Sequence, residues 1–88
     1  MSYKVEILKG ALKQLKKLSP ELQERIQVKI DDLAIEPRPS GVKKLKGKEN
    51  AYRIRLGEYR VIYDIFDDIL VVNVVELGHR SKVYNDKS

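Results

Sequence analysis

Hydrophobic and polar residues alternate on both sides of Gly57-Glu58, a pattern typical of two strands joined by a tight turn. Glycine as the first of two central residues indicates a type II′ hairpin. Counting outward from this turn places Arg55 opposite Arg60, and residues directly opposite share a face of the sheet. One face is therefore basic, with Arg53, Arg55, Arg60 and Ile62. The other is apolar, with Tyr52, Ile54, Leu56, Tyr59, Val61 and Tyr63.

Two amphipathic helices are predicted ahead of this hairpin. Leucines spaced by four, three and three residues line one side of a first helix that starts near Ala11, and lysines line its other side. Ser19 and Pro20 then suit the N-cap and first position of a second helix, which should end near Glu36. The expected buried positions are Leu8, Leu12, Leu15 and Leu18 in the first helix, and Leu22, Ile26, Ile30 and Leu33 in the second.

The remaining strands flank these elements. Residues 3–7 alternate as a first strand, and 42–50 form either an irregular strand or a loop. After a turn at Asp67-Asp68, residues 69–77 are an almost unbroken β-branched run, typical of a strand that is covered on both faces, and Gly78 should end it. We therefore expect one α+β domain over 1–88. It has a small antiparallel-rich sheet, element order β-α-α-β-β-β, and an N-terminal helical hairpin packed on one face.

Composition narrows the classes of function. The 88 residues carry 18 Lys and Arg against 13 Asp and Glu, a net charge of +5, which suits a nucleic acid or an acidic protein as partner. There is no cysteine and only one histidine, and no carboxylates are spaced as a metal site, so we expect neither metal nor cofactor. No segment is apolar enough for a signal peptide or a membrane span, and we expect a cytoplasmic protein.

The basic face of the hairpin is the strongest candidate site. Like charges that face each other across two strands destabilise the hairpin, and Arg55 and Arg60 have no obvious acidic neighbour in the sequence. A polyanion that binds between them would explain their placement. The alternative is that the arginines are solvated edge-strand charges that discourage aggregation.

Several short motifs extend this pattern along the chain. Leu-Lys-Gly at 45–47 precedes Arg-Ile-Arg-Leu at 53–56, then come Gly-x-Tyr-Arg-Val-Ile-Tyr at 57–63 and Gly-His-Arg-x-x-Val-Tyr at 78–84. In this order and spacing, the chain resembles over nearly its whole length the RelE-like toxins of the RelE/ParE superfamily. The resemblance implies a toxin that cleaves mRNA in the ribosomal A site, and a RelB-like antitoxin that holds it inactive in a heterodimer or heterotetramer.

The resemblance also implies which residues act. Family members carry basic side chains at the positions of Arg53 and Arg55, arginines at those of Arg60 and Arg80, and a tyrosine at that of Tyr84. The best-known members have lysine where this chain has Arg53 and Arg55. We expect these five residues to be catalytic, and further lysines to bind the RNA backbone: Lys43, Lys44, Lys46, Lys48 and Lys82. Arg60 faces away from the predicted core, so its replacement is expected to leave the fold intact.

Metal-independent RNA cleavage by the 2′-hydroxyl needs a proton acceptor as well as charge stabilisation. Arginine supplies the second but is a poor base, so the acceptor stays open between several side chains: Tyr84, His79, Lys46, Lys48 and Glu49. Each has a structural alternative, since Tyr84 can simply pack and His79 can simply hydrogen-bond.

Two other functions remain open from the sequence. A ParE-like relative of the same fold would inhibit DNA gyrase by binding a protein surface. A non-catalytic basic module would bind RNA or DNA through the arginines without cutting it.

Overall fold

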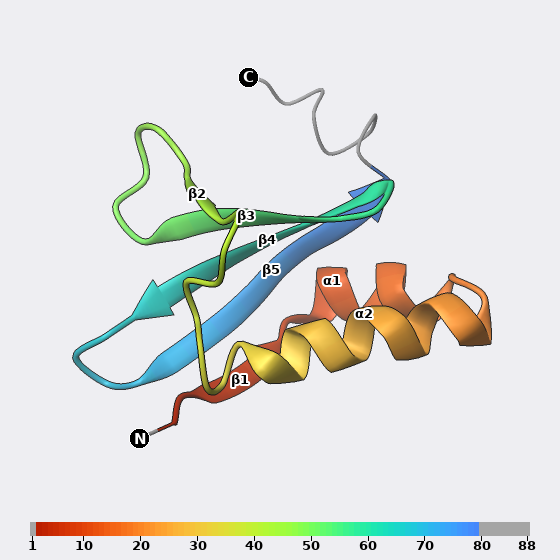
Figure 1. Cartoon of the computed structure of the whole chain (residues 1–88), viewed down its shortest axis with the longest axis horizontal. Helices are drawn as coiled ribbons and strands as arrows, with labels where there is room; N and C mark the ends of the chain where they lie inside the picture. Colours follow the sequence, from red (N-terminus) through yellow and green to blue (C-terminus); the bar gives the residue numbers. More distant parts are fainter. Residues whose placement is uncertain (1, 80–88) are drawn as a thin grey trace.

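The computed structural model describes residues 2–79, which form two helices and a five-stranded sheet (Figure 1). The strands lie in the order β1-β5-β4-β3-β2, with β1 parallel to β5 and every other pair antiparallel. The predicted α+β class and element order are confirmed, with one added short strand. The elements are β1 (Lys4–Ile7), α1 (Lys9–Lys16), α2 (Pro20–Asp32), β2 (Lys43–Lys44), β3 (Ala51–Leu56), β4 (Tyr59–Phe66) and β5 (Val71–His79).

The β3–β4 hairpin has the predicted register. Leu56 pairs with Tyr59, Arg55 with Arg60 and Arg53 with Ile62. Gly57 adopts a positive φ of 63° whereas the residue after it does not, which is the conformation of a type II′ turn. The turn therefore sets which side chains of both strands share a face.

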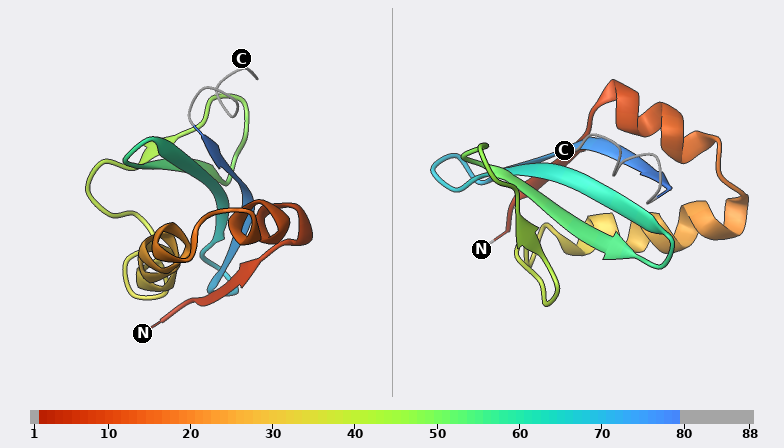
Figure 2. Two further views of the ribbon diagram at one scale, coloured as in Figure 1. Left: turned by 90° about the vertical axis from the view of Figure 1, so that its right-hand side faces the viewer. Right: turned by 90° about the horizontal axis from the view of Figure 1, so that it is seen from above.

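The core lies between the two helices and one face of the sheet (Figure 2). Ile26 and Ile30 of α2 are buried against side chains of β4 and β5, and α1 adds Ala11 and Leu15. Burial of this apolar surface is the main stabilising force of so small a domain. The strands contribute Val61, Tyr63, Ile65, Val72, Val74 and Leu77.

The helix boundaries differ from the predicted ones. The first helix begins at Lys9, with Leu8 at the N-cap, and Leu8 and Leu12 are 38% and 37% exposed. Its buried residues are Ala11 and Leu15. Ala11 packs directly against the core, and the spacing of the leucines does not predict this. The second helix ends at Asp32, because residues 33–35 bond to carbonyls three residues back, a tighter final turn. Ser19 accepts a hydrogen bond from the Leu22 amide at 3.3 Å, as the predicted N-cap.

Strand β5 departs most from prediction. It starts at Val71 and continues through Gly78 to His79, because Leu70 ends the preceding turn with a positive φ of 55°. A β-bulge interrupts its pairing with β4, since Tyr63 pairs with Val74 and Ile62 with Glu76. Val75 is the extra residue and is 38% exposed, so the prediction of a strand covered on both faces is wrong.

Asp67 fastens the segment that follows α2 to the sheet. Arg38 donates two hydrogen bonds to its carboxylate, at 3.2 and 2.7 Å, and Tyr3 donates a third at 2.6 Å. The Arg38 guanidinium also lies 5.1 Å from the centre of the Tyr52 ring, and the buried Tyr63 hydroxyl donates to the Pro37 carbonyl at 2.8 Å. The bonds from Arg38 and Tyr3 lower the pKa of Asp67 to about 2.

No helix within residues 2–79 is long and apolar enough to cross a membrane.

Replacing Ile30 with alanine should destabilise the protein by about 2 to 5 kcal/mol, because it removes buried apolar volume and leaves a cavity. Ile30 is 1% exposed, whereas Val28 of the same helix is 52% exposed. Val28→Ala is therefore the matched control, and we expect it to change stability by less than about 0.5 kcal/mol. Urea unfolding of the two variants measures both values, and equal losses would contradict the described orientation of α2.

Replacing Asp67 with asparagine should destabilise the protein at neutral pH and make its stability depend less on pH below about 4. A carboxylate whose folded pKa is lowered from 3.8 to about 2 contributes stability above pH 4, and this contribution is lost as the pH falls toward 2. The melting temperature of the wild type should therefore fall more steeply over this pH window than that of Asp67→Asn. At pH 7 the melting temperature of Asp67→Asn should be the lower of the two. Asp68→Asn is the control, since Asp68 makes no hydrogen bond or ion pair among residues 2–79. If plots of melting temperature against pH run parallel for Asp67→Asn and the wild type, the stabilising role of Asp67 is disproved.

Candidate functional site

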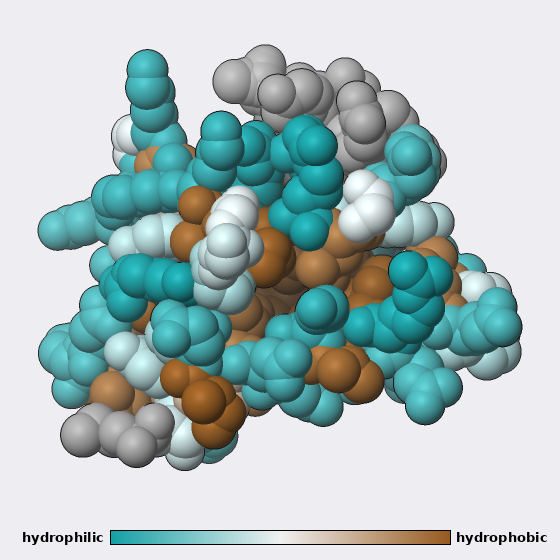
Figure 3. All heavy atoms as spheres, in the orientation of Figure 1, coloured by the Kyte–Doolittle hydropathy of each residue, from teal (hydrophilic) through white to brown (hydrophobic). Residues whose placement is uncertain are grey.

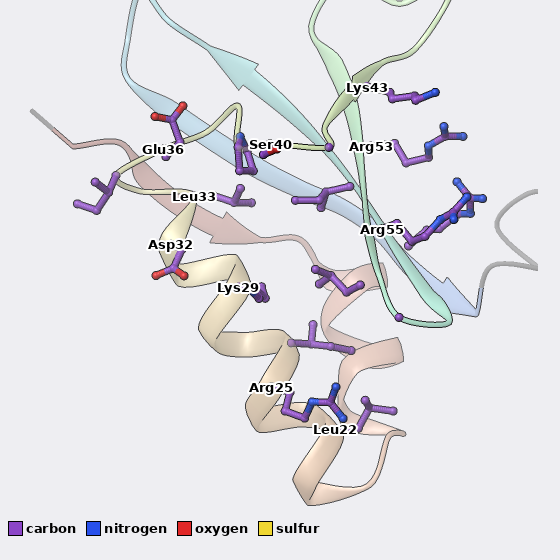
Figure 4. Close-up of a pocket in the computed structure, with 18 residues that line it drawn as sticks. Leu22, Arg25, Lys29, Asp32, Leu33, Glu36, Ser40, Lys43, Arg53 and Arg55 are labelled. Atoms are coloured by element: carbon purple, nitrogen blue, oxygen red, sulfur yellow. The ribbon is translucent and has the colours of Figure 1, made fainter.

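The candidate site is the face of the sheet that lies opposite the helices, here called the arginine face: Lys43, Arg53, Arg55, Arg60 and Ile62. The register joins these residues, because Lys43 of β2 pairs with Arg53, and Arg55 pairs with Arg60. Figure 4 shows Lys43, Arg53 and Arg55 pointing to the same side of β3, away from α2. Three neighbouring strands therefore supply cations to one surface, as a phosphate-binding site requires.

The three arginines differ in exposure. Arg55 is exposed, Arg53 is half-buried, and Arg60 is only 2% exposed although it lies on the face opposite the core. The expectation that Arg60 can be replaced without effect on the fold stays a prediction, and the burial of this side chain weighs against it, since a buried guanidinium contributes to packing as well as charge. Contact between Arg60 and a phosphate requires the atoms that cover this side chain to move.

The predicted RNA-binding lysines divide between the two faces. Lys43 lies on the arginine face, but Lys44, one residue later, pairs with Tyr52 on the opposite face. Its ammonium lies 5.2 Å from the centre of the Tyr52 ring and donates a hydrogen bond to the Glu49 carbonyl. Lys46 and Lys48 are exposed in the loop between β2 and β3, beyond the paired residues.

His79 also lies away from the arginine face. It pairs with Tyr59, whose ring it meets edge-on at 5.6 Å, and its Nε2 is 3.8 Å from the Glu58 carboxylate. Tyr59 packs against the core, so His79 shares the helix-covered side of the sheet. Three further predicted site residues lie outside the described residues: Arg80, Lys82 and Tyr84.

A groove of about 1110 Å³ separates α2 from the edge of the β3–β4 hairpin. Figure 3 shows it as an apolar hollow with hydrophilic groups along its margins. Its lining includes the apolar side chains Leu22, Ile26, Leu33, Ile54 and Leu56. The basic residues along it are Arg25, Lys29, Lys43, Arg53, Arg55 and Arg60. The sequence reasoning missed this groove, although Arg25 and Lys29, four residues apart on α2, were a readable signal.

The site offers cations rather than a cluster of metal ligands. Within residues 2–79, no three histidine or carboxylate side chains gather in a way that could hold a metal ion. Guanidinium groups can bind phosphate oxygens in pairs and stabilise negative charge that develops on them.

The family model described as the ParE toxin of type II toxin–antitoxin systems, parDE, matches residues 5–84. The mRNA interferase toxin RelE of Escherichia coli K12 is 32% identical over 90 residues, which cover 98% of this chain and 94% of the relative. Toxin RelE3 of Methanocaldococcus jannaschii is 30% identical over 86 residues, which cover 93% of this chain and 96% of the relative.

Solved structures are similar in fold. In the archaeal RelE–RelB complex from Pyrococcus horikoshii OT3, the matching chain has a TM-score of 0.82 and 36% identity, and the match covers 93% of this chain and 99% of that one. In the intact E. coli RelBE toxin–antitoxin complex, the values are 0.76 and 30%, with 89% and 96% covered.

Lys43→Ala and Lys44→Ala form a matched pair that tests the arginine face. If a polyanion binds there, Lys43→Ala should weaken binding of a single-stranded RNA and lower the slope of log affinity against log salt by about 0.7. Lys44→Ala, with the same change of charge on the other face, should leave the slope nearly unchanged. Fluorescence anisotropy of a labelled RNA at several salt concentrations measures both slopes, and equal effects would indicate diffuse attraction in place of a site.

Proposed function

Since the chain belongs to the ParE toxin family of type II toxin–antitoxin systems and is RelE-like, we propose that it is a ribosome-dependent endoribonuclease that cleaves mRNA in the A site. The observation that carries this proposal is the gathering of Lys43, Arg53, Arg55 and Arg60 on one face by the sheet register. The relative in E. coli is named an mRNA interferase, which supports the same chemistry here.

The arginines would act on the scissile phosphate. In the proposed reaction the 2′-hydroxyl oxygen attacks the adjacent phosphorus, and the bond from phosphorus to the 5′-oxygen breaks. Negative charge builds up on the phosphate oxygens, and Arg53, Arg55 and Arg60 would neutralise it. From the family pattern, Arg80 would contact the phosphate or the leaving oxygen, and Tyr84 would stack on a base or move a proton.

Dependence on the ribosome follows from the nature of this site. A site made mainly of permanent positive charge binds a phosphate but does little to align the 2′-hydroxyl with it. A partner that holds the mRNA in attack geometry supplies this alignment, and orientation alone accounts for large rate gains. The lysines of α1 would then bind ribosomal RNA. The alternative is that they simply form the solvent-exposed side of an amphipathic helix.

A RelB-like antitoxin is the proposed partner, because relatives of this chain were solved as RelE–RelB complexes. The groove beside α2 suits an amphipathic antitoxin segment, with apolar side chains against Ile26 and Ile54 and carboxylates toward Arg25 and Lys29. The resulting assembly would be a heterodimer or heterotetramer. Action on translating ribosomes would place the toxin in the cytoplasm.

Inhibition of DNA gyrase is the second candidate, because the matching family model is described as a ParE toxin. A gyrase inhibitor that binds a protein surface has no need of a phosphate-binding face, so the arginine face favours the nuclease. A non-catalytic RNA-binding module would use the same face but would leave no cut ends.

Translation of a defined mRNA in vitro with the purified protein distinguishes the three functions. We expect cuts at codon intervals, only when ribosomes are present, and a 2′,3′-cyclic phosphate on the upstream fragment. Mapping of the 5′ ends and chemical analysis of the 3′ ends measure this. Intact mRNA together with inhibited supercoiling by gyrase would favour the second candidate, and intact mRNA with RNA binding alone would favour the third.

A further inference from the structure

The proposed cleavage needs a proton acceptor that the arginines cannot supply, because a guanidinium stays protonated. Of the acceptors that the sequence leaves open, Tyr84 lies outside the described residues, and His79 lies on the helix-covered side of the sheet. Lys46, Lys48 and Glu49 lie in the loop that precedes β3. A base that acts beside a phosphate bound by these arginines must lie on the arginine face itself.

The β-bulge in β5 turns a carboxylate toward that face. Val72 and Val74 point into the core, so an uninterrupted alternation would also direct residue 76 inward. The extra residue, Val75, shifts the phase, and Leu77 becomes the next buried residue. Glu76 thereby pairs with Ile62 and shares its face. Bulges commonly re-aim a side chain in this way next to active sites.

Glu76 completes a row across the sheet. Lys43, Arg53 and Ile62 lie directly opposite one another on successive strands, and Glu76 follows on β5. Arg53 and Glu76 are thus two strand spacings apart, about 10 Å between backbones, so a phosphate held above Ile62 lies within reach of both side chains. Two residues nearer the hairpin turn, Arg55, Arg60 and Gly78 lie opposite one another. Because Gly78 has no side chain, nothing from β5 separates Arg60 from Glu76 on this face.

Glu76 is also accessible to a substrate. Its side chain is half-buried, so part of it remains in contact with solvent. Among the described residues, β1 pairs only with residues 71–74 of β5, so no strand lies beside residue 76 on that side.

We infer that Glu76 is the general base of the proposed cleavage, an inference that rests on the proposed function. Its carboxylate takes the proton of the 2′-hydroxyl while the 2′-oxygen bonds to phosphorus. The bond from phosphorus to the 5′-oxygen breaks, and the leaving oxygen takes a proton from solvent. Protonated Glu76 then returns its proton to solvent, so the products are a 2′,3′-cyclic phosphate and a 5′-hydroxyl.

Asp64 is the other carboxylate on this part of the face and serves as the control. It pairs with Ala51 and Asn73, one row farther from the turn, about 7 Å along the strand. No cation of the arginine face pairs with it. A phosphate held by Arg53 and Arg60 would therefore present its neighbouring 2′-hydroxyl to Glu76 and not to Asp64.

The test is single-turnover cleavage of mRNA on programmed ribosomes with saturating toxin. We expect Glu76→Gln to cleave at least about 100-fold more slowly than the wild type, the scale of a lost general base, while its affinity for the ribosomes stays within about twofold. Asp64→Asn should cleave within about threefold of the wild type.

A second variant covers the case in which Glu76→Gln folds poorly. Glu76→Ala leaves space for a small carboxylate, so added formate should restore part of its cleavage rate and none of that of an Arg55→Ala variant. Wild-type rates in Glu76→Gln, or no response of Glu76→Ala to formate, would overturn the role of Glu76 and leave the nuclease function standing. Absence of cleavage by the wild type would overturn both.

Discussion

The pairing of β3 with β4 determines everything else at the site. A two-residue turn at Gly57 and Glu58 places Arg55 opposite Arg60, and a slip of one residue would send the arginines toward the core and Ile54 and Val61 toward solvent. Burial of the apolar side against α2 therefore enforces a crowded cationic side. The arginines stay close together despite their mutual repulsion, because burial of the apolar side chains stabilises this register of β3 and β4.

Short-range rules predicted the elements whose signals are local. The hairpin register followed from Gly57 and the alternation around it, and the start of α2 followed from Ser19 and Pro20. The helical pair and the class of fold followed from periodicity in the same way. The end of α2 was placed too late, because prolines exclude continuation of a helix but do not determine where its last regular turn lies.

The features that sequence could not predict depend on contacts between distant segments. The bulge at Val75 arises only where β5 meets β4, and an unbroken β-branched run carries no trace of it. The same holds for the exposure of Leu12, for the burial of Arg60, and for the opposite placement of Lys43 and Lys44. Charge and spacing thus predicted a phosphate-binding site, which stays a prediction, whereas the set of side chains that share one face could be found only from the pairing of the strands.

The parallel pairing of β1 with β5 joins the first and the last strand found within residues 2–79. During synthesis, β1 leaves the exit tunnel long before β5 does, so this pair of strands can form only after residues 71–74 have emerged. The sheet, and with it the core beneath the two helices, is therefore completed only after β5 has been synthesised.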